Sequence, residues 1–126
     1  METIEQNRTE GFERVFGAQP SLRVSAAGRI NLIGEHVDYC GGKVFPASLN
    51  LNCTVYARPN GTDVINVYAD DLDENAPLTI GKIADYKHIK WGKYQAGVAY
   101  VLQQTGVPLI GCDLYYSCTV PFGSGL

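Results

Sequence analysis

The sequence predicts a single domain that combines helices with β-strands. Apolar and polar residues alternate over Leu22–Ala26, which suits a strand, and apolar residues recur at helical spacing over Trp91–Gln104. Asn60-Gly61 adds a strong turn signal between two apolar runs. At 126 residues the chain has the length of one domain and can bury a sizeable core.

The composition is that of an ordinary globular protein. Hydrophobic residues make up 45% of the chain and the formal net charge is −3. This slightly acidic balance gives no electrostatic footprint for nucleic acid or an anionic membrane surface. No apolar run approaches the roughly 20 residues of a membrane span, and the N-terminus lacks a secretory pattern. We therefore expect neither a nucleic-acid nor a membrane partner.

The four cysteines, at positions 40, 53, 112 and 118, show neither CxxC spacing nor the density of a disulfide scaffold. Cys53 and Cys118 lie in apolar or β-branched runs, which is typical of small buried thiols. The cysteines thus predict a reducing compartment, the cytoplasm.

The first third of the chain begins with a predicted helix. Apolar positions over Thr3–Phe16 have helical spacing, and Gly17 is a candidate C-cap. The strand at Leu22–Ala26 then leads into a polar cluster. Ile30–Ile33 is apolar, and we expect it to be partly buried beneath that cluster.

The remainder is predicted to be mainly strand. Lys43–Arg58 has strand propensity, and the turn at Pro59–Thr62 predicts a hairpin with Asp63–Ala69 as the return strand. Leu78–Ile83 is a candidate short strand. After the helix at Trp91–Gln104, Leu109–Val120 is a strand of good propensity.

The polar cluster lies within Gly28–Pro46, among four glycines. Unpaired charges are costly to bury, so we expect Glu35, His36 and Asp38 to line a polar, partly accessible pocket. Two carboxylates and an imidazole suit vicinal hydroxyls, each of which needs a donor and an acceptor. Arg29 adds a fixed positive charge that can counter anionic charge. The alternative is a structural ion-pair network of Arg29 with Glu35 or Asp38.

A metal site is a rival interpretation. His36 and Asp38, with His88 as a third ligand, have the ingredients of a two-His, one-carboxylate iron centre. His88 falls in a predicted loop, however, where a surface histidine is more common. We therefore expect no metal ligands in the chain. The acidic segment Asp70–Glu74 is predicted to be a solvated loop, because it lacks the ligand spacing of a calcium loop.

Val120–Leu126 is a glycine-rich loop that follows a predicted strand. Such a loop could present backbone N–H groups to phosphates if a helix followed it. It fits neither the Walker pattern nor the dinucleotide fingerprint. Together with the acidic cluster it suggests a phosphorylated ligand beside a polyol. Since such a loop needs a following element, we expect the chain to be part of a longer protein.

These residues carry a family resemblance. Gly28–Gly42 reads Gly-Arg-Ile-Asn-Leu-Ile-Gly-Glu-His-Val-Asp-Tyr-Cys-Gly-Gly and resembles the galactokinase signature of the GHMP superfamily of sugar and small-molecule kinases. Pro121–Leu126 resembles the start of the superfamily's phosphate loop. Trp91–Tyr94, with Gly97-Val98, resembles a segment near the nucleotide. The resemblance spans the chain from about Val24 to Leu126.

The resemblance implies an α+β fold of the ribosomal S5 domain 2-like type, with a mixed β-sheet and packed helices. Residues 1–126 would be the N-terminal part of a galactokinase-like GHMP kinase domain. The rest of that domain, the C-terminal domain, the catalytic aspartate and the magnesium ligands would lie beyond residue 126. We therefore expect the chain alone to be inactive.

The resemblance also implies a role for each matching residue. Glu35, His36 and Asp38 would hold hydroxyls of galactose, with Val37 among the substrate-binding residues. Arg29 would stabilise charge as phosphate passes from ATP to the C1 hydroxyl, with Mg²⁺ neutralising the triphosphate. The ATP-binding residues would be Gly123, Ser124, Gly125 and Leu126, with Trp91 near the adenine. For Trp91, packing in the core is the open alternative.

Three positions depart from the family pattern. Ala27 stands where proline is common, Val37 where threonine is frequent, and Cys40 where asparagine is frequent. A cysteine at the last position also occurs in relatives that act on N-acetylgalactosamine, so the hexose stays open. A non-catalytic relative that binds galactose and ATP and signals through a protein is a further alternative. Oligomeric state cannot be derived from these patterns.

Overall fold

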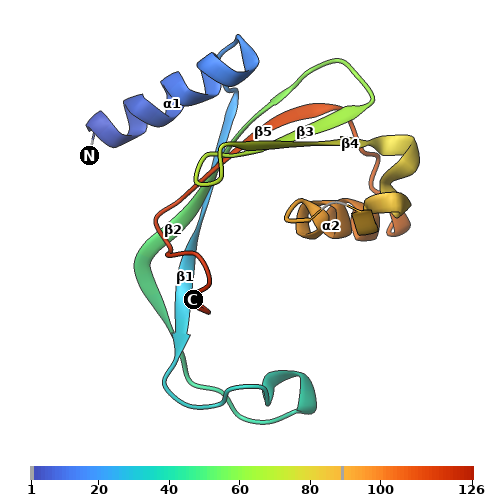
Figure 1. The fold of residues 1–126 in the computed structure, drawn as a ribbon. Coiled ribbons are helices and arrows are strands. Elements are labelled where there is room, and N and C mark those ends of the chain that lie inside the picture. Colours follow the sequence, from blue (N-terminus) through green and yellow to red (C-terminus); the bar gives the residue numbers. More distant parts are fainter. Residues whose placement is uncertain (1, 89) are drawn as a thin grey trace.

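The computed structural model describes residues 2–88 and 90–126. Helices and strands alternate with short 3₁₀ segments (η), and Figure 1 shows their arrangement. In chain order the elements are α1 (Glu2–Phe16), β1 (Leu22–Asn31), η1 (Asp38–Cys40), β2 (Pro46–Pro59), β3 (Val64–Ala69), β4 (Glu74–Thr79), η2 (Ile80–His88), α2 (Lys93–Gln104) and β5 (Cys112–Cys118).

The strands form one mixed five-stranded sheet in the order β1-β2-β5-β3-β4. β5 is parallel to β3, whereas the β1–β2, β2–β5 and β3–β4 pairs are antiparallel. This arrangement confirms the predicted α+β class with a mixed sheet and packed helices.

The predicted hairpin between Lys43–Arg58 and Asp63–Ala69 is wrong, because β5 lies between these two strands. Asn60 still organises a turn there. Its side-chain amide donates to the Val64 carbonyl at 3.1 Å and to Asp113 Oδ1, at the start of β5, at 3.0 Å. The turn therefore binds β5 instead of closing a tight hairpin.

The helix predictions are confirmed within two residues, since α1 covers Thr3–Phe16 and α2 ends at Gln104 as expected. The strand predicted at Leu78–Ile83 is displaced toward the N-terminus. β4 ends at Thr79, and the N–H of Ile80 donates to the Asp63 carbonyl at 2.9 Å as a 3₁₀ segment begins. Among the described residues, no helix is long and apolar enough to cross a membrane.

The sheet has a separate hydrophobic core on each face, because successive strand residues point in opposite directions. Ile65 and Val67 of β3 face α2 and η2, whereas Tyr68 faces α1. Figure 1 shows α1 and α2 on opposite sides of the sheet. The buried residues of the α2 face are Ile65, Val67, Ala76, Leu78, Ile83, Ala96 and Ala99. Those of the α1 face are Phe12, Tyr56, Tyr68 and Tyr115.

Two tyrosines of the α1 face bind carboxylates of the β3–β4 turn. The rings of Tyr68 and Tyr115 stack with their centroids 5.3 Å apart. The Tyr68 hydroxyl donates to the Asp73 carboxylate, and this bond raises the pKa of Tyr68. Burial, together with a hydrogen bond to Asp70, raises the pKa of Tyr115. The acidic turn is therefore not only solvated but also fixes the aromatic core.

The expectation that Cys53 and Cys118 are free buried thiols is wrong. They form a disulfide between β2 and β5, with their Cα atoms 4.0 Å apart. The two residues are 65 positions apart in the sequence but directly opposite in the register of the two strands. Because disulfides are uncommon in reducing compartments, the cysteines no longer support the predicted cytoplasmic location, which stays a prediction.

Replacing Leu78 by alanine tests the core beneath α2. Leu78 is 3% exposed, so its truncation should leave a cavity and lower the free energy of unfolding by about 2–5 kcal/mol. Urea unfolding measures the change. The matched control is Leu22→Ala, because Leu22 is 58% exposed; it should change stability by less than about 0.5 kcal/mol. Equal effects of the two substitutions would contradict this core.

Tyr115 should make stability depend on alkaline pH. The pKa of Tyr115 is raised in the folded state above its ordinary value of 10.0, so the unfolded chain loses this proton first as the pH rises. The contribution of Tyr115 to the free energy of unfolding is complete below its ordinary pKa of 10.0, and it is lost as the pH rises toward the raised pKa of the folded state. Urea unfolding at several pH values should give a shallower alkaline decline for Tyr115→Phe. Tyr39→Phe, at an exposed tyrosine, should keep the original slope.

Candidate functional site

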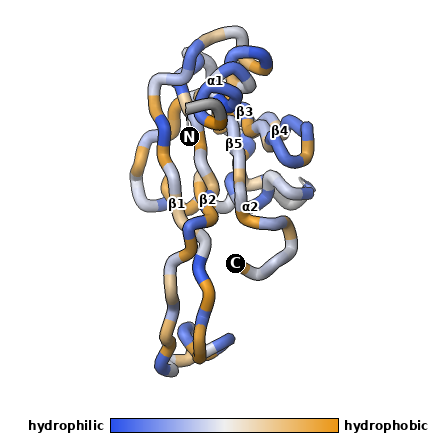
Figure 2. The backbone as a smooth tube through the Cα atoms, turned by 90° about the vertical axis from the view of Figure 1, so that its left-hand side faces the viewer, coloured by the Kyte–Doolittle hydropathy of each residue, from blue (hydrophilic) through white to orange (hydrophobic). Residues whose placement is uncertain are grey.

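The signature loop, residues 32–45, closes the ribbon formed by β1 and β2. The N–H of Leu32 donates to the Phe45 carbonyl at 2.9 Å, and the N–H of Phe45 donates to the Ile33 carbonyl at 3.0 Å. Figures 1 and 2 show this loop projecting from the far end of the ribbon, away from α1. Leu32 and Ile33 are 62% and 71% exposed, so the expected burial of Ile30–Ile33 is wrong for these two residues.

Backbone geometry fixes the shape of the signature loop. Gly34 has φ +106°, and a Cβ there would lie 2.7 Å from the Lys43 carbonyl oxygen. His36 also has a positive φ of 58°, which is uncommon for a residue with a side chain. The carbonyl of Val37 accepts the N–H groups of Cys40 at 3.1 Å and Gly42 at 2.7 Å. The tip is therefore a specific turn around η1.

The candidate sugar ligands lie together on this tip. Glu35, His36 and Asp38 are exposed, and Val37 is partly exposed. The expectation that they line a partly accessible pocket is therefore not met, because the loop projects from the sheet. His36 Nδ1 is 2.9 Å from the Tyr39 hydroxyl, and the two rings meet edge-on. This contact leaves the second ring nitrogen of His36 available to a ligand.

Arg29 binds the glycine loop rather than the acidic residues of the signature. Its Nη1 donates to the Gly125 carbonyl at 3.0 Å, across 96 positions of sequence. The two ion pairs found within residues 2–88 and 90–126 are Arg23–Glu5 and Arg58–Asp113. The alternative of a structural pair between Arg29 and Glu35 or Asp38 is therefore not observed.

A second contact joins the same two motifs. The β1–β2 register shifts between Ala27 and Arg29, so Gly28 lies at an irregularity. A Cβ at Gly28 would lie 3.1 Å from Cγ2 of Val120, which begins the glycine loop. A residue with a side chain at position 28 would force Val120 to shift, whereas glycine leaves Val120 in its position. Sequence reasoning missed this contact, because nothing in a sequence shows which strand lies beside Gly28.

The glycine loop itself is exposed. Gly123 and Gly125 have φ angles of +70° and +76°, and a Cβ at either position would meet nothing within 4 Å. The N–H of Ser124 donates to the Pro121 carbonyl at 3.3 Å. This exposed loop with two left-handed glycines is compatible with a phosphate-binding turn.

Trp91 lies on another part of the molecule, just before α2. It is half-buried against the α2-face core, and its Nε1 donates to Glu74 Oε2 at 2.7 Å. Trp91 thus packs against the core, but from the segment before α2 and not from the helix itself. A place near the adenine stays a prediction.

The metal interpretation gains no support from the described part of the chain. No three His, Cys, Asp or Glu side chains there are grouped to hold a metal ion. In particular, His36, Asp38 and His88 do not form such a group. The same holds for the acidic β3–β4 turn.

Comparisons with known proteins bear on both motifs. The galactokinase galactose-binding signature matches residues 10–59. A galactokinase of Chloroflexus aurantiacus is 38% identical over 115 residues, which are 91% of this chain and 30% of that protein. One of Roseiflexus sp. is 38% identical over 117 residues, 93% of this chain and 30% of that protein.

Solved structures agree with the sequence matches. Lactococcus lactis galactokinase, crystallised with galactose, has a TM-score of 0.85 and 31% identity over 98% of this chain and 33% of its own. Methanococcus jannaschii mevalonate kinase shares the fold, with a TM-score of 0.69 and 20% identity over 83% of this chain and 34% of its own. The fold is therefore that of the GHMP kinases.

Within that class, the chain is similar to the galactokinases. Its signature residues and its fold both match theirs. The chain spans about 30% of the length of the relatives it matches.

Replacing Gly34 by alanine should disrupt the signature loop. The positive φ and the contact with Lys43 should together cost about 1–3 kcal/mol locally, because a side chain cannot take this backbone conformation without strain. Hydrogen exchange of the Phe45 amide reports on closure of the loop base, so this amide should lose protection. Gly41→Ala is the matched control, since Gly41 also has a positive φ of +74° but a Cβ there meets nothing within 4 Å; it isolates backbone strain from the contact and should reduce Phe45 protection less. Unchanged Phe45 protection in Gly34→Ala would contradict this geometry.

Proposed function

We propose that this chain supplies the sugar-binding loop and part of the phosphate-binding loop of an ATP-dependent galactokinase. The reaction transfers the γ-phosphate of ATP to the C1 hydroxyl of galactose and yields galactose 1-phosphate. The observation that carries the proposal is the bond from Arg29 to Gly125. It joins the base of the galactokinase signature to a glycine loop of phosphate-binding type.

The signature loop has the chemistry to hold a sugar. Glu35 and Asp38 accept hydrogen bonds from hydroxyls, while the free ring nitrogen of His36 donates or accepts. Val37 contributes through its backbone, whose carbonyl shapes the turn that presents its neighbours. Arg29 lies at the base of the loop, where a fixed positive charge stabilises negative charge on a transferred phosphoryl group.

The glycine loop fits a nucleotide phosphate. Gly123, Ser124 and Gly125 are exposed, and the two glycines carry no side chain that could block a phosphate, while the Ser124 N–H already donates to the Pro121 carbonyl. Gly125 and Leu126 adjoin the Arg29 contact, so a phosphate bound there would lie near a guanidinium. Among the described residues no cluster of carboxylates fits Mg²⁺, so none is assigned to hold it. When bound, the ion would neutralise charge on the triphosphate.

The hexose is the open part of the proposal. Cys40 is exposed and ends η1, two positions after Asp38, so it adjoins the proposed sugar ligands. A small thiol at this place leaves room beside the sugar. N-acetylgalactosamine is therefore tested beside galactose.

The first test follows sugar 1-phosphate formation from ATP and Mg²⁺ by the complete protein that contains this sequence. Galactose and N-acetylgalactosamine are compared at equal concentrations. Turnover on galactose is the expected result, and the 126-residue chain alone should show none. Galactose binding without turnover would favour the non-catalytic relative that signals through a protein. Absence of both binding and turnover would refute the sugar site.

Asp38→Asn tests the sugar contact in the same assay. Loss of a charged hydrogen-bond acceptor costs about 1.5–3 kcal/mol, which corresponds to a decrease in kcat/KM for galactose of about 10- to 150-fold. Asp71→Asn is the matched control, because Asp71 is an exposed carboxylate in the β3–β4 turn. The control should keep full activity. Equal activity of the two variants would remove Asp38 from the site.

A further inference from the structure

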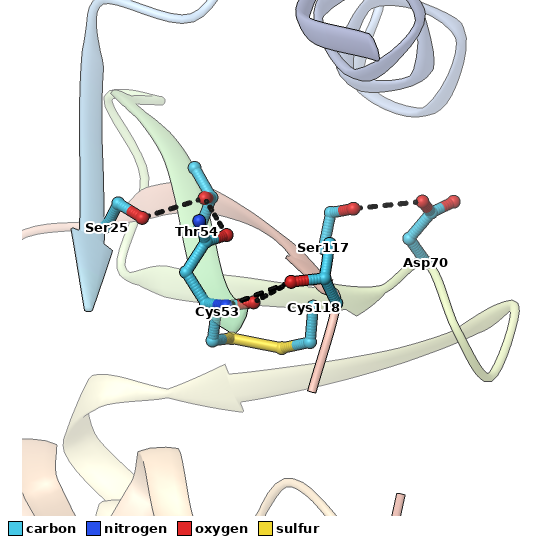
Figure 3. Close-up of a disulfide and its surroundings, with 8 residues drawn as sticks. Ser25, Cys53, Thr54, Asp70, Ser117 and Cys118 are labelled. Atoms are coloured by element: carbon cyan, nitrogen blue, oxygen red, sulfur yellow. Dashed lines mark hydrogen bonds between the residues drawn. A yellow bond between two sulfur atoms is a disulfide. The ribbon is translucent and has the colours of Figure 1, made fainter. Parts of the chain in front are cut away.

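The Cys53–Cys118 disulfide joins β2 to the last residue of β5. Figure 3 shows it between the two strands. The neighbouring pair, Asn52 and Thr119, shares a backbone hydrogen bond of 2.7 Å from the Thr119 N–H to the Asn52 carbonyl. Pairs alternate along an antiparallel ladder, so the two cysteines occupy a non-hydrogen-bonded position, where the Cα atoms are closest. Register therefore places both side chains where they can bond.

The disulfide lies immediately before the contacts that connect the two motifs. Beyond Cys118, the Asn52 N–H donates to Thr119 Oγ1 at 2.9 Å. The next residue is Val120, which lies over Gly28, and Arg29 binds the loop five positions later. The disulfide is thus the covalent link nearest to the glycine loop, and the links beyond it are hydrogen bonds and packing.

Polar contacts beside the disulfide join β2 to β1 and β5 to the β3–β4 turn, while the backbone register pairs β2 with β5 up to Thr54–Ser117. Thr54 is fully buried, and its hydroxyl pairs with that of Ser25 at 3.1 Å. Ser117 donates to Asp70 Oδ2 at 3.4 Å, as Figure 3 shows. These bonds lie on the sheet side of the disulfide, away from the glycine loop. Breaking the disulfide therefore leaves the sheet paired and frees its end.

Cys53 and Cys118 are only partly buried. The two remaining cysteines differ in setting. Cys40 is an exposed free thiol on the signature loop, and burial raises the pKa of the Cys112 thiol. Neither is paired with the disulfide in the strand register.

We propose that Cys53 and Cys118 form a redox-sensitive clamp on the glycine loop. A low-molecular-mass thiol attacks one sulfur as its thiolate, the S–S bond breaks, and a mixed disulfide forms. A second molecule of that thiol then displaces the protein sulfur. The two-electron reduction leaves two protein thiols, and the attacking thiol is recovered as its own disulfide. Oxidation restores the clamp by the reverse exchange.

The clamp changes how firmly the end of β5 is held. In the oxidised chain, Thr119 follows a residue that is covalently tied to β2. In the reduced chain, only the Asn52–Thr119 hydrogen bonds, the packing of Val120 and the Arg29 bond hold this end, so local opening becomes more frequent. The inference does not rest on the proposed kinase activity. If that activity is present, the clamp would act on the loop that meets the nucleotide.

Thiol counting comes first in the test. The chain is alkylated under denaturing, non-reducing conditions and weighed by intact mass spectrometry. Two alkylations, on Cys40 and Cys112, are expected before treatment with dithiothreitol, and four after it. Four alkylations of the air-oxidised chain before reduction would overturn the proposal.

Hydrogen exchange by NMR then measures the clamp. On reduction, the amides of Asn52 and Thr119 should exchange about tenfold faster. The Ile80 amide, which donates to Asp63 at the other end of the sheet, is the internal control and should not change. Equal acceleration at Ile80 would mean global loosening, and no change at Thr119 would mean no clamp. Either result overturns the proposal.

Cysteine variants distinguish a local clamp at the end of β5 from global loosening of the sheet. Cys53→Ser and Cys118→Ser should each show fast Thr119 exchange without reductant and no further response to it. Cys112→Ser, on the same strand, should keep the wild-type response. Circular dichroism checks that each variant keeps the sheet. A folded Cys53→Ser variant with slow Thr119 exchange would contradict the clamp.

Discussion

The antiparallel pairing of β2 with β5 is the interaction on which the rest of this structure depends. β2 returns from the signature loop, and β5 leads into the glycine loop. Because the two strands run in opposite directions, the end of β5 lies beside the ribbon that carries the signature. This places Val120 over Gly28 and the Gly125 carbonyl within reach of Arg29. Two motifs distant in sequence thereby share one region.

The same pairing explains why the signature loop is exposed. β5 ends at Cys118, so among the described residues the part of the β1–β2 ribbon beyond it has no third strand beside it. Figure 2 shows this part extending from the body of the molecule. A two-stranded ribbon buries little apolar surface, so its tip depends on local turns. Here the positive φ angles of Gly34 and His36 and the carbonyl of Val37 supply them.

Local structure was largely predictable from the sequence, and strand partners were not. Helical spacing gave α1 and α2 nearly correctly, alternation gave β1 and strand propensity gave β5, because these signals arise within a few residues. The Asn60-Gly61 turn was recognised, but the sequence does not reveal that β5 inserts beside it. The signature residues stood out by their chemistry. Their exposure did not, because it depends on where another strand ends.

The cysteines show the same limit. Apolar surroundings predicted buried thiols at Cys53 and Cys118, which is the usual state of such residues. Their pairing depends on the register of two strands, which cannot be read from residues 65 positions apart in the sequence. The Arg29 contact is of this kind as well. From the sequence, Arg29 was recognised as a positive charge that could counter an anion. Only the fold shows that it contacts the glycine loop, at Gly125.

The most direct test of this account is an NMR measurement of the contact between Gly28 and Val120. In the labelled, oxidised chain, the Val120 methyl protons should give nuclear Overhauser effects to the Gly28 α-protons, since a Cβ at Gly28 would lie only 3.1 Å from Val120 Cγ2. Detection would place the glycine loop at the base of the signature loop. If the Val120 methyls gave none to Gly28, the two motifs would not meet and the central claim would be contradicted.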